Sequence, residues 1–331
     1  MTARAVAMAR GVGILAGYVA DRMFGDPQRG HPVAVFGSVA QRVEGRMYAD
    51  SRPAGVAYTA LLVGGVAVGG AVVERLAVHP VARAVVTAAA TWTVLGGRSL
   101  EREAAAVHAH LAADDLPAAR VQVSRLVGRD TEHLDAGEVS RAVVESVAEN
   151  TVDAVVSPLV WGAACGVPGL LGYRAINTLD AMVGHHNARY ERFGWASARL
   201  DDVANLAGAR LAGVLTLVAE PRGAAGAWRA WRRDAAGHPS PNAGVVEAAF
   251  AGSLGIRLGG TNRYYGTRVE HRAVMGDGRG AEPADVVAAN RLARRIGAGS
   301  AVVSAVVATV LPVVVATRLG ELIARRGQNG A

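Results

Sequence analysis

Long apolar runs, rather than alternating apolar and polar positions, dominate this chain. Three runs contain no charged residue, and each covers about 20 residues, which as a helix spans roughly the 30 Å core of a bilayer. They extend from Ala54 to Val73, from Ala154 to Tyr173 and from Ile296 to Thr317. The pattern predicts a membrane-spanning helix at each of these positions.

Weaker apolar segments add further candidates. The stretch from Gly11 to Ala20 is interpreted as an uncleaved first membrane segment. Two longer runs, 76–97 and 203–219, are interrupted by Arg83 and Arg210. An Arg at mid-membrane costs on the order of 3 kcal/mol, so these helices must face protein or let the Arg reach an interface. The sequence predicts an all-α, polytopic membrane protein with four to six transmembrane helices, forming one multi-pass domain over residues 1–331.

The first polar insertion, residues 98–150, has the start and stop signals of helices. Ser99 is placed to cap a helix that runs through His110. Pro117 fits the first turn of a second helix, and Gly128 is placed to end it. We therefore expect a helical hairpin that leads into a third helix.

The second polar insertion, residues 221–295, has a different composition. Its segment 224–235 carries two Trp beside three Arg, as interfacial helices do. The following segments 238–244 and 258–262 are rich in Pro, Gly and Asn and are interpreted as loops. This insertion is expected to be rich in loops.

Composition excludes several function classes. The chain of 331 residues is 51% hydrophobic and 19% charged, against about 25% charged in ordinary soluble proteins, which excludes disorder. All 35 basic residues are Arg, so neither a P-loop Lys nor a Lys Schiff base can occur. The net charge is +7, but aromatic residues are sparse and no basic block is long, so nucleic acid is not an expected partner. The single cysteine, Cys165, excludes an intramolecular disulfide.

The third helix of the first insertion concentrates acidic residues. It begins at Asp135, which with Glu138 makes a capping box. Glu145, Glu149 and Asp153 follow at spacings of four, on one helix face, where each like-charged pair repels by roughly 0.2–0.5 kcal/mol. Two interpretations stay open. Arg neighbours neutralise a solvated stripe, or the oxygens bind Mg²⁺ together with a phosphate.

Other polar residues lie beside the apolar runs. Asn177 and Asp180 are three residues apart, and Asp201 and Asp202 are adjacent. Carboxylates near a membrane are costly, so they mark function more often than surface carboxylates do, although solvation at a helix end also explains the last pair. The Gly-Gly pair at 259–260, with Arg nearby, would let backbone N–H groups approach a phosphate, or simply form a turn.

Taken in order, these segments resemble the cobalamin-biosynthesis membrane protein family of adenosylcobinamide-phosphate synthase, over nearly the whole chain. The matching segments are Gly25-Asp26-Pro27 with His31-Pro32-Val33, Gly128-Arg129-Asp130-Thr131, the segments 145–153 and 173–184, Asp201-Asp202, Ser240-Pro241-Asn242-Ala243-Gly244 and Leu258-Gly259-Gly260. Related proteins often have Lys where this chain has Arg174 and His185-His186, and Ser where it has Ala181. Any phosphate contact of such a Lys must be made by Arg here.

The resemblance implies a multi-pass protein of the cytoplasmic membrane that uses ATP to join adenosylcobyric acid to (R)-1-aminopropan-2-ol phosphate through an amide bond. A carboxylate is a poor acyl donor, so the simplest route is an acyl phosphate made with Mg²⁺ and ATP. Because ATP is used, the active loops are expected to face the cytoplasm. A homo-oligomer, or association with other cobalamin-pathway enzymes, stays open.

These considerations give three sets of expected site residues. The catalytic residues expected are Glu145, Glu149 and Asp180. The expected Mg²⁺ ligands are Glu145, Glu149, Asp153, Asp201 and Asp202. The residues expected to bind substrate or phosphate are Arg129, Asp130, Arg174, Asn177, Ser240, Asn242, Gly259, Gly260 and Arg263.

Two other functions compete with the ligase. A membrane-embedded, Mg²⁺-dependent prenyl or phosphatidyl transferase also clusters Asp and Asn near helix ends, and it would need no ATP. A transporter or corrinoid-binding membrane subunit is the third interpretation. Transporters tend to have paired halves and broken helices, and no internal duplication is visible in this sequence.

Overall fold

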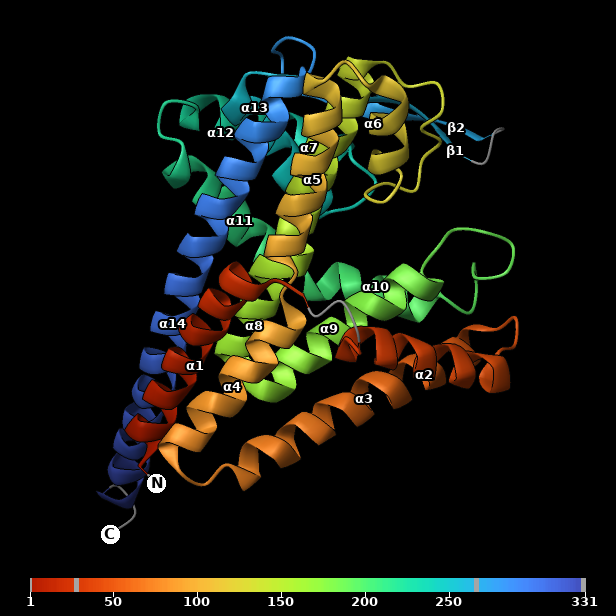
Figure 1. The fold of residues 1–331 in the computed structure, drawn as a ribbon. Helices are drawn as coiled ribbons and strands as arrows, with labels where there is room; N and C mark the ends of the chain where they lie inside the picture. Colours follow the sequence, from red (N-terminus) through yellow and green to blue (C-terminus); the bar gives the residue numbers. More distant parts are fainter. Residues whose placement is uncertain (1, 27–29, 265–267, 329–331) are drawn as a thin grey trace. The chain divides into compact units, whose positions relative to one another are not determined.

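The computed structural model describes residues 2–26, 30–264 and 268–328, and its ribbon is drawn in Figure 1. These residues are mostly helical, so the expected all-α class holds apart from one two-stranded sheet. The chain divides into two compact units. Unit 1 comprises Met1–Leu95, Pro158–Ala198 and Ala301–Ala331, and unit 2 comprises Gly96–Ser157 and Arg199–Ser300. The expectation of a single multi-pass domain stays a prediction.

Unit 1 is a helical assembly around a small apolar core. Its elements are α1 (Ala3–Phe24), α2 (Pro32–Met47), α3 (Arg52–Leu76), α4 (Pro80–Val94), α8 (Ser157–Cys165) and α9 (Val167–Val183). Helix α1 packs along α4, and α9 packs against α3 and α2 (Figure 1). Tyr58, Leu179 and Phe193 are fully buried where α3 and α9 meet.

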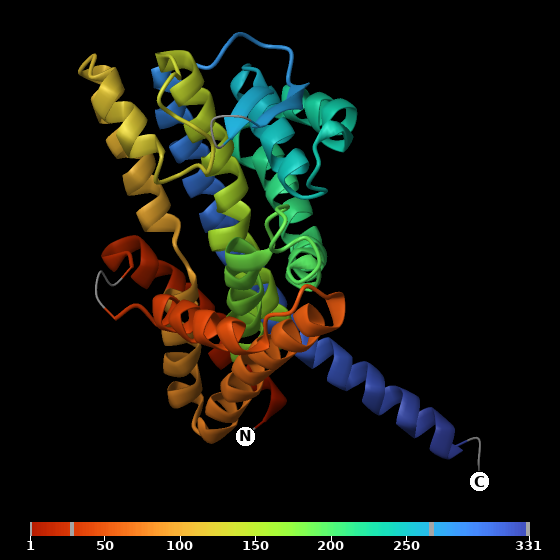
Figure 2. The same ribbon diagram turned by 90° about the vertical axis from the view of Figure 1, so that its right-hand side faces the viewer.

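Unit 2 is organised around the apolar helix α13. Its elements are α5 (Gly97–Ala112), α6 (Leu116–Val123), α7 (Ala136–Thr151), the π-helix η1 (Val152–Val156), α11 (Leu206–Ala219), α12 (Ala224–Asp234), the 3-10 turn η2 (Ala235–Gly237), α13 (Ala243–Leu254), β1 (Leu258–Tyr264) and β2 (Arg268–Met275). Two helices contain residues of both units, namely α10 (Trp195–Ala204) and α14 (Pro283–Gln328). Helix α13 contacts α7, α11 and α12, and Figure 2 shows the two strands beside it.

Fewer helices than expected are long and apolar enough to cross a membrane. Within the described part of the chain they are α3 and the section Pro283–Leu311 of α14, with α10 and α11 together as a third candidate, bent by 41°. The stretch 154–173 is not one helix, because the chain breaks at Gly166 between α8 and α9. The stretch 76–97 contains the 15-residue helix α4. The described residues therefore contain two or three candidate spans, against the four to six expected.

Several helix ends are where the sequence places them, and others are not. The capping box of Asp135 and Glu138 is present at the start of α7. Ser99 is not a cap, because α5 begins at Gly97, after Gly96. The second helix ends at Val123, five residues before the expected stop at Gly128. The reciprocal pair of the capping box thus predicted a helix start correctly, whereas a single capping residue or a glycine alone did not.

The interpretation of residues 258–262 as a loop is wrong. They form most of β1, which pairs in antiparallel register with β2, so that Thr261 lies opposite His271. A shift of register between Leu258 and Gly260 interrupts the pairing at its start. Glycines at this irregularity gave the segment a turn-like composition, although Leu258–Tyr264 is a β-strand.

Candidate functional site

Helix α7 presents two carboxylates one turn apart. Glu145 and Glu149 are four residues apart in the regular α-helix, so they share a face. The π-helix η1 begins at Val152, and its wider turn changes the direction of Asp153 from the one that a continuous α-helix gives. Of the three carboxylates expected on one helix face, only Glu145 and Glu149 therefore keep regular α-helical spacing.

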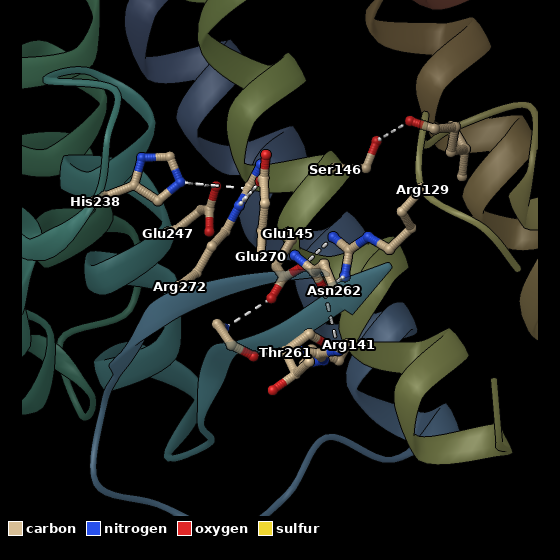
Figure 3. A network of polar contacts seen from close by, with 12 residues as sticks. Arg129, Arg141, Glu145, Ser146, His238, Glu247, Thr261, Asn262, Glu270 and Arg272 are labelled. Carbon is tan, nitrogen blue, oxygen red and sulfur yellow. Dashed lines mark hydrogen bonds and ion pairs between the residues drawn. The ribbon is translucent and has the colours of Figure 1, made fainter. Parts of the chain in front are cut away.

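Glu145 is held at both of its oxygen atoms. Its Oε2 forms an ion pair with the Arg129 guanidinium, and its Oε1 accepts a hydrogen bond of 2.8 Å from the Gly259 backbone N–H. Arg129 also donates a hydrogen bond of 2.7 Å to Oδ1 of Asn262. All three side chains are buried. The loop after α6, helix α7 and strand β1 are thus joined through one polar cluster (Figure 3).

A second arginine ties the hairpin to α7. Arg141 donates to the Gly259 carbonyl, and at 3.2 Å to the carbonyl of Thr261. The close approach requires a glycine, because the φ of Gly259 is +82° and an added Cβ would lie 2.1 Å from the carbonyl oxygen of Ala273. The Asp130 N–H donates to the Arg263 carbonyl at 2.8 Å. Strand β1 is therefore fixed against α7 along several residues.

The cluster contains a third carboxylate, that of Glu247 on α13. Glu247 is 1% exposed, and its Oε2 has no hydrogen-bond partner among the described residues. Burial raises the pKa of Glu247 well above its ordinary value, and the charges of Glu145 and Glu149 raise it further. Burial and Glu145 likewise raise the pKa of Glu149, although Glu149 keeps solvent-accessible surface. Negative charge is concentrated here and is only partly balanced by Arg272 and Arg129.

His238 lies on the opposite side of Glu247 from α7 in Figure 3. Its Nδ1 accepts a hydrogen bond of 3.0 Å from the Ser240 backbone N–H. Its Nε2 lies 3.6 Å from Oε1 of Glu247 and 3.5 Å from the Arg272 guanidinium. Burial and the neighbouring Arg272 lower the pKa of His238, so the ring is neutral at pH 7. A neutral imidazole thus stands beside a buried carboxylate.

Ser240 and Asn242 organise the loop that precedes α13. Ser240 Oγ accepts from the backbone N–H of Ala243 at 3.1 Å. Asn242 donates to the Asp202 carbonyl at 2.7 Å and accepts from Arg210 at 2.7 Å. Both residues thus hold the loop in place. A phosphate contact from either one stays a prediction.

Asp201 and Asp202 face different partners. Asp201 accepts a hydrogen bond of 2.9 Å from Asn205, whose Oδ1 accepts from Ser157 at 2.6 Å. Asp202 pairs with Arg199 at 3.5 Å. The two neighbouring acids are therefore not interchangeable, and their expected role as Mg²⁺ ligands stays a prediction.

Three expected site residues belong to unit 1. Arg174, Asn177 and Asp180 lie along one face of α9, and Arg174 donates to Asn177 at 3.4 Å. The other expected residues belong to unit 2. The structure brings together Arg129, Asp130, Glu145, Glu149, Gly259, Gly260 and Arg263 around α7 and β1.

Three residues of the cluster were not expected from the sequence, namely Glu247, Arg272 and His238. Glu247 is the single charged residue of the otherwise apolar α13. A lone carboxylate in an apolar helix is costly, and this signal could have identified it. Arg272 lies on β2, whose pairing with β1 was not predicted.

Comparison with known proteins identifies the family. Residues 14–293 match the family model described as CobD/Cbib protein. The chain belongs to the CobD/Cbib family. It is 52% identical over 300 residues to the cobalamin biosynthesis protein CobD of Mycobacterium tuberculosis (strain ATCC 25618 / H37Rv), covering 89% of this chain and 95% of the relative. The protein of the same name from Geobacter metallireducens is 46% identical over 276 residues, covering 81% and 86%. No solved structure matches the chain.

Proposed function

We propose that this membrane protein acts in cobalamin biosynthesis as an ATP-dependent amide ligase. Membership of the CobD/Cbib family supports the pathway. The proposed reaction joins the carboxylate of adenosylcobyric acid to the amine of (R)-1-aminopropan-2-ol phosphate and gives adenosylcobinamide phosphate. ATP would first transfer its γ-phosphoryl group to the carboxylate, and the amine would then displace phosphate from the acyl phosphate.

The observation that carries the proposal is the cluster of Glu145, Glu149 and Glu247 beside Arg129 and Arg272. Phosphoryl transfer needs metal-held phosphates and positive charge near the developing oxyanions. Carboxylates and guanidinium groups of this kind supply both requirements. The low exposure of Glu145, Glu247 and Arg129 also favours strong electrostatic interactions with a bound phosphate.

The donor set fits Mg²⁺ when a phosphate completes it. Among the residues that the structure describes, no group of three or more His, Cys, Asp or Glu could hold a metal by itself. Mg²⁺, however, usually keeps several waters and takes only one or two carboxylates with substrate phosphates. Burial, and after it the charge of neighbouring carboxylates, raises the pKa of Glu149 and of Glu247, and a nearby cation would favour their charged forms. When bound, Mg²⁺ would neutralise phosphate charge during transfer.

The residues of the cluster take different roles in this proposal. Both oxygens of Glu145 are already engaged, so Glu145 positions Arg129 and the Gly259 backbone. Glu149 has accessible surface and is the carboxylate assigned to Mg²⁺–phosphate. Arg272 lies among the carboxylates and is assigned to a phosphate of ATP or of the amine substrate. Because ATP is cytoplasmic, these groups are assigned to the cytoplasmic side of the membrane.

The decisive experiment measures product and nucleotide together. Purified protein is incubated with Mg²⁺, ATP, adenosylcobyric acid and the amino alcohol phosphate, and the amide is detected by mass spectrometry. ADP release that requires both the corrinoid and the amine supports the ligase. Amide that forms without ATP would contradict the ATP-dependent mechanism. Substrate uptake into vesicles without a covalent product would overturn the enzymatic proposal.

A further inference from the structure

A basic pocket lies in unit 2 between the start of α12, the end of α13 and α14. It encloses about 540 Å³, within the usual range for a small-ligand site. Four arginines line it, together with a single acid, Glu220. They are Arg222, Arg229, Arg291 and Arg295. The lining therefore carries an excess of positive charge.

Three of these arginines have no side-chain partner among the residues that the structure describes. Arg295 forms an ion pair of 2.9 Å with Glu220, the single acid of the pocket. Arg222, Arg229 and Arg291 are exposed, and within the described ranges no carboxylate or carbonyl binds their guanidinium groups. Like charges gathered at one pocket repel one another, so an anion placed among them would be stabilised.

The backbone adds to this preference for an anion. Helix α12 begins at Ala224 after the N-cap Gly223, which makes no side-chain capping hydrogen bond. Ala225 and Gly226, in the first turn, line the pocket. First-turn N–H groups have no acceptor within the helix, and they carry the positive end of the helix dipole. The arginines and the helix start therefore favour the same kind of ligand.

The pocket also lies at the polar ends of two candidate membrane helices. Helix α11 ends at Ala219, whose carbonyl accepts a hydrogen bond of 2.9 Å from Arg295. Arg295 directly precedes the apolar run of α14 that starts at Ile296. On α12, Trp228 is 47% exposed and stacks with Arg232. Trp and Arg at the ends of spans are typical of the headgroup region of a bilayer.

From these observations we infer that the pocket of Arg222, Arg229 and Arg291 binds the phosphate of an anionic phospholipid headgroup. The site is separate in its residues from the carboxylate cluster of α7 and α13. The lipid supplies the negative charge that the pocket lacks, and its acyl chains extend along the apolar helices that end there. A free phosphate compound shares this chemistry, so the test separates the two sources.

The test measures thermal stability of the full chain in neutral detergent. Short-chain phosphatidylglycerol is titrated, with phosphatidylcholine as the uncharged comparison and glycerol phosphate and inorganic phosphate as soluble probes. We expect phosphatidylglycerol to raise the melting temperature of the wild type far more than the other three. Replacing all three arginines, R222Q/R229Q/R291Q, should weaken the apparent affinity at least tenfold.

A matched control carries the same loss of charge elsewhere in unit 2. Arg102, Arg125 and Arg257 are exposed, lie outside the pocket and have no side-chain partner among the described residues. R102Q/R125Q/R257Q should respond to phosphatidylglycerol as the wild type does. If the triple pocket variant does not fold, the single variants R222Q and R291Q provide the test with a smaller loss.

The outcomes are distinct. Equal responses of wild type and pocket variants would overturn the site, and so would an equal loss in the control. If glycerol phosphate or inorganic phosphate produced the same shift and competed with the lipid, the assignment to a phospholipid would be overturned. All readouts are binding measurements, so they do not depend on whether the ligase reaction proposed above is correct.

Discussion

Arg129 and Glu145 form an ion pair in which their side chains are only 6% and 4% exposed. Arg129 lies in the loop after α6, whereas Glu145 lies in the third turn of α7. Because Glu145 also accepts the Gly259 N–H and Arg129 also donates to Asn262, the pair fixes strand β1 beside α7. The geometry of the carboxylate cluster therefore depends on this pair.

Breaking the pair should destabilise the protein. Removing one partner leaves a buried charge without compensation, which costs about 3–5 kcal/mol. We expect Arg129→Ala and Glu145→Ala each to lower the free energy of unfolding by this amount. The double variant should lose clearly less than the sum of the two. Denaturant unfolding in detergent measures the cycle, and additive losses would show that the two side chains do not interact.

The approach of β1 to β2 at Gly259 can be tested with a single methyl group. Gly259→Ala introduces a Cβ at a φ of +82° and 2.1 Å from a backbone oxygen. We expect a loss of more than about 1 kcal/mol, measured by thermal unfolding. Gly280→Ala is the matched control, because an added Cβ there has no neighbour within 4 Å. Equal stability of the two variants would contradict the close packing of the hairpin.

Much of the fold follows from features that act locally. The capping box at Asp135 and the uncharged run within α3 depend on residues close in sequence, and both were predicted correctly. The strand pairing of β1 with β2 was missed because its glycines have the composition of a turn. The break at Gly166 was missed because a hydropathy profile contains no information on backbone direction.

In the candidate site, too, local features were predicted and features that depend on distant residues were not. Glu145 and Glu149 were predicted to share a face because the helical period requires it. Glu247 is more than 90 positions away and meets them only through the packing of α13 on α7. The residue pattern of a single helix contains no information on this contact between helices. The sequence also could not show that Glu145 is bound at both oxygens while Glu149 is solvent-accessible. The difference arises because Arg129 and the Gly259 N–H bind Glu145, and both are distant from it in sequence or come from another element.

Glu149 should be essential for amide formation in the proposed reaction. Glu149→Gln keeps the shape of the side chain and removes the negative charge assigned to Mg²⁺–phosphate. We expect the rate of ATP-dependent amide formation to fall on the order of a hundredfold or more, as for other groups that stabilise transferred charge. The exposed acid Glu132 lies outside the cluster, and Glu132→Gln is the control. A wild-type rate for Glu149→Gln would rule out its role in metal binding.

The contact of Asp234 with Gly276, the residue that follows β2, should make the stability of unit 2 sensitive to acid. Asp234 accepts a hydrogen bond of 2.6 Å from Arg233 and one of 2.8 Å from the Gly276 backbone N–H. The hydrogen bond from Arg233 lowers the pKa of Asp234 below its ordinary value of 3.8, and the Gly276 N–H acts in the same direction. The folded state therefore holds the carboxylate in its charged form more strongly than the unfolded state does.

The sign of the pH effect follows from this difference. The stabilisation by Asp234 is fully present above the unfolded pKa, taken as the ordinary value of 3.8, and is lost as the pH falls through the lower folded pKa. We expect Asp234→Asn to melt at a lower temperature than wild type at pH 7, and the gap between them to shrink on acidification below pH 4. Melting temperatures across this range, with Glu132→Gln as the control, measure the gap. A gap that stayed constant or widened in acid would contradict the role of the Asp234 carboxylate.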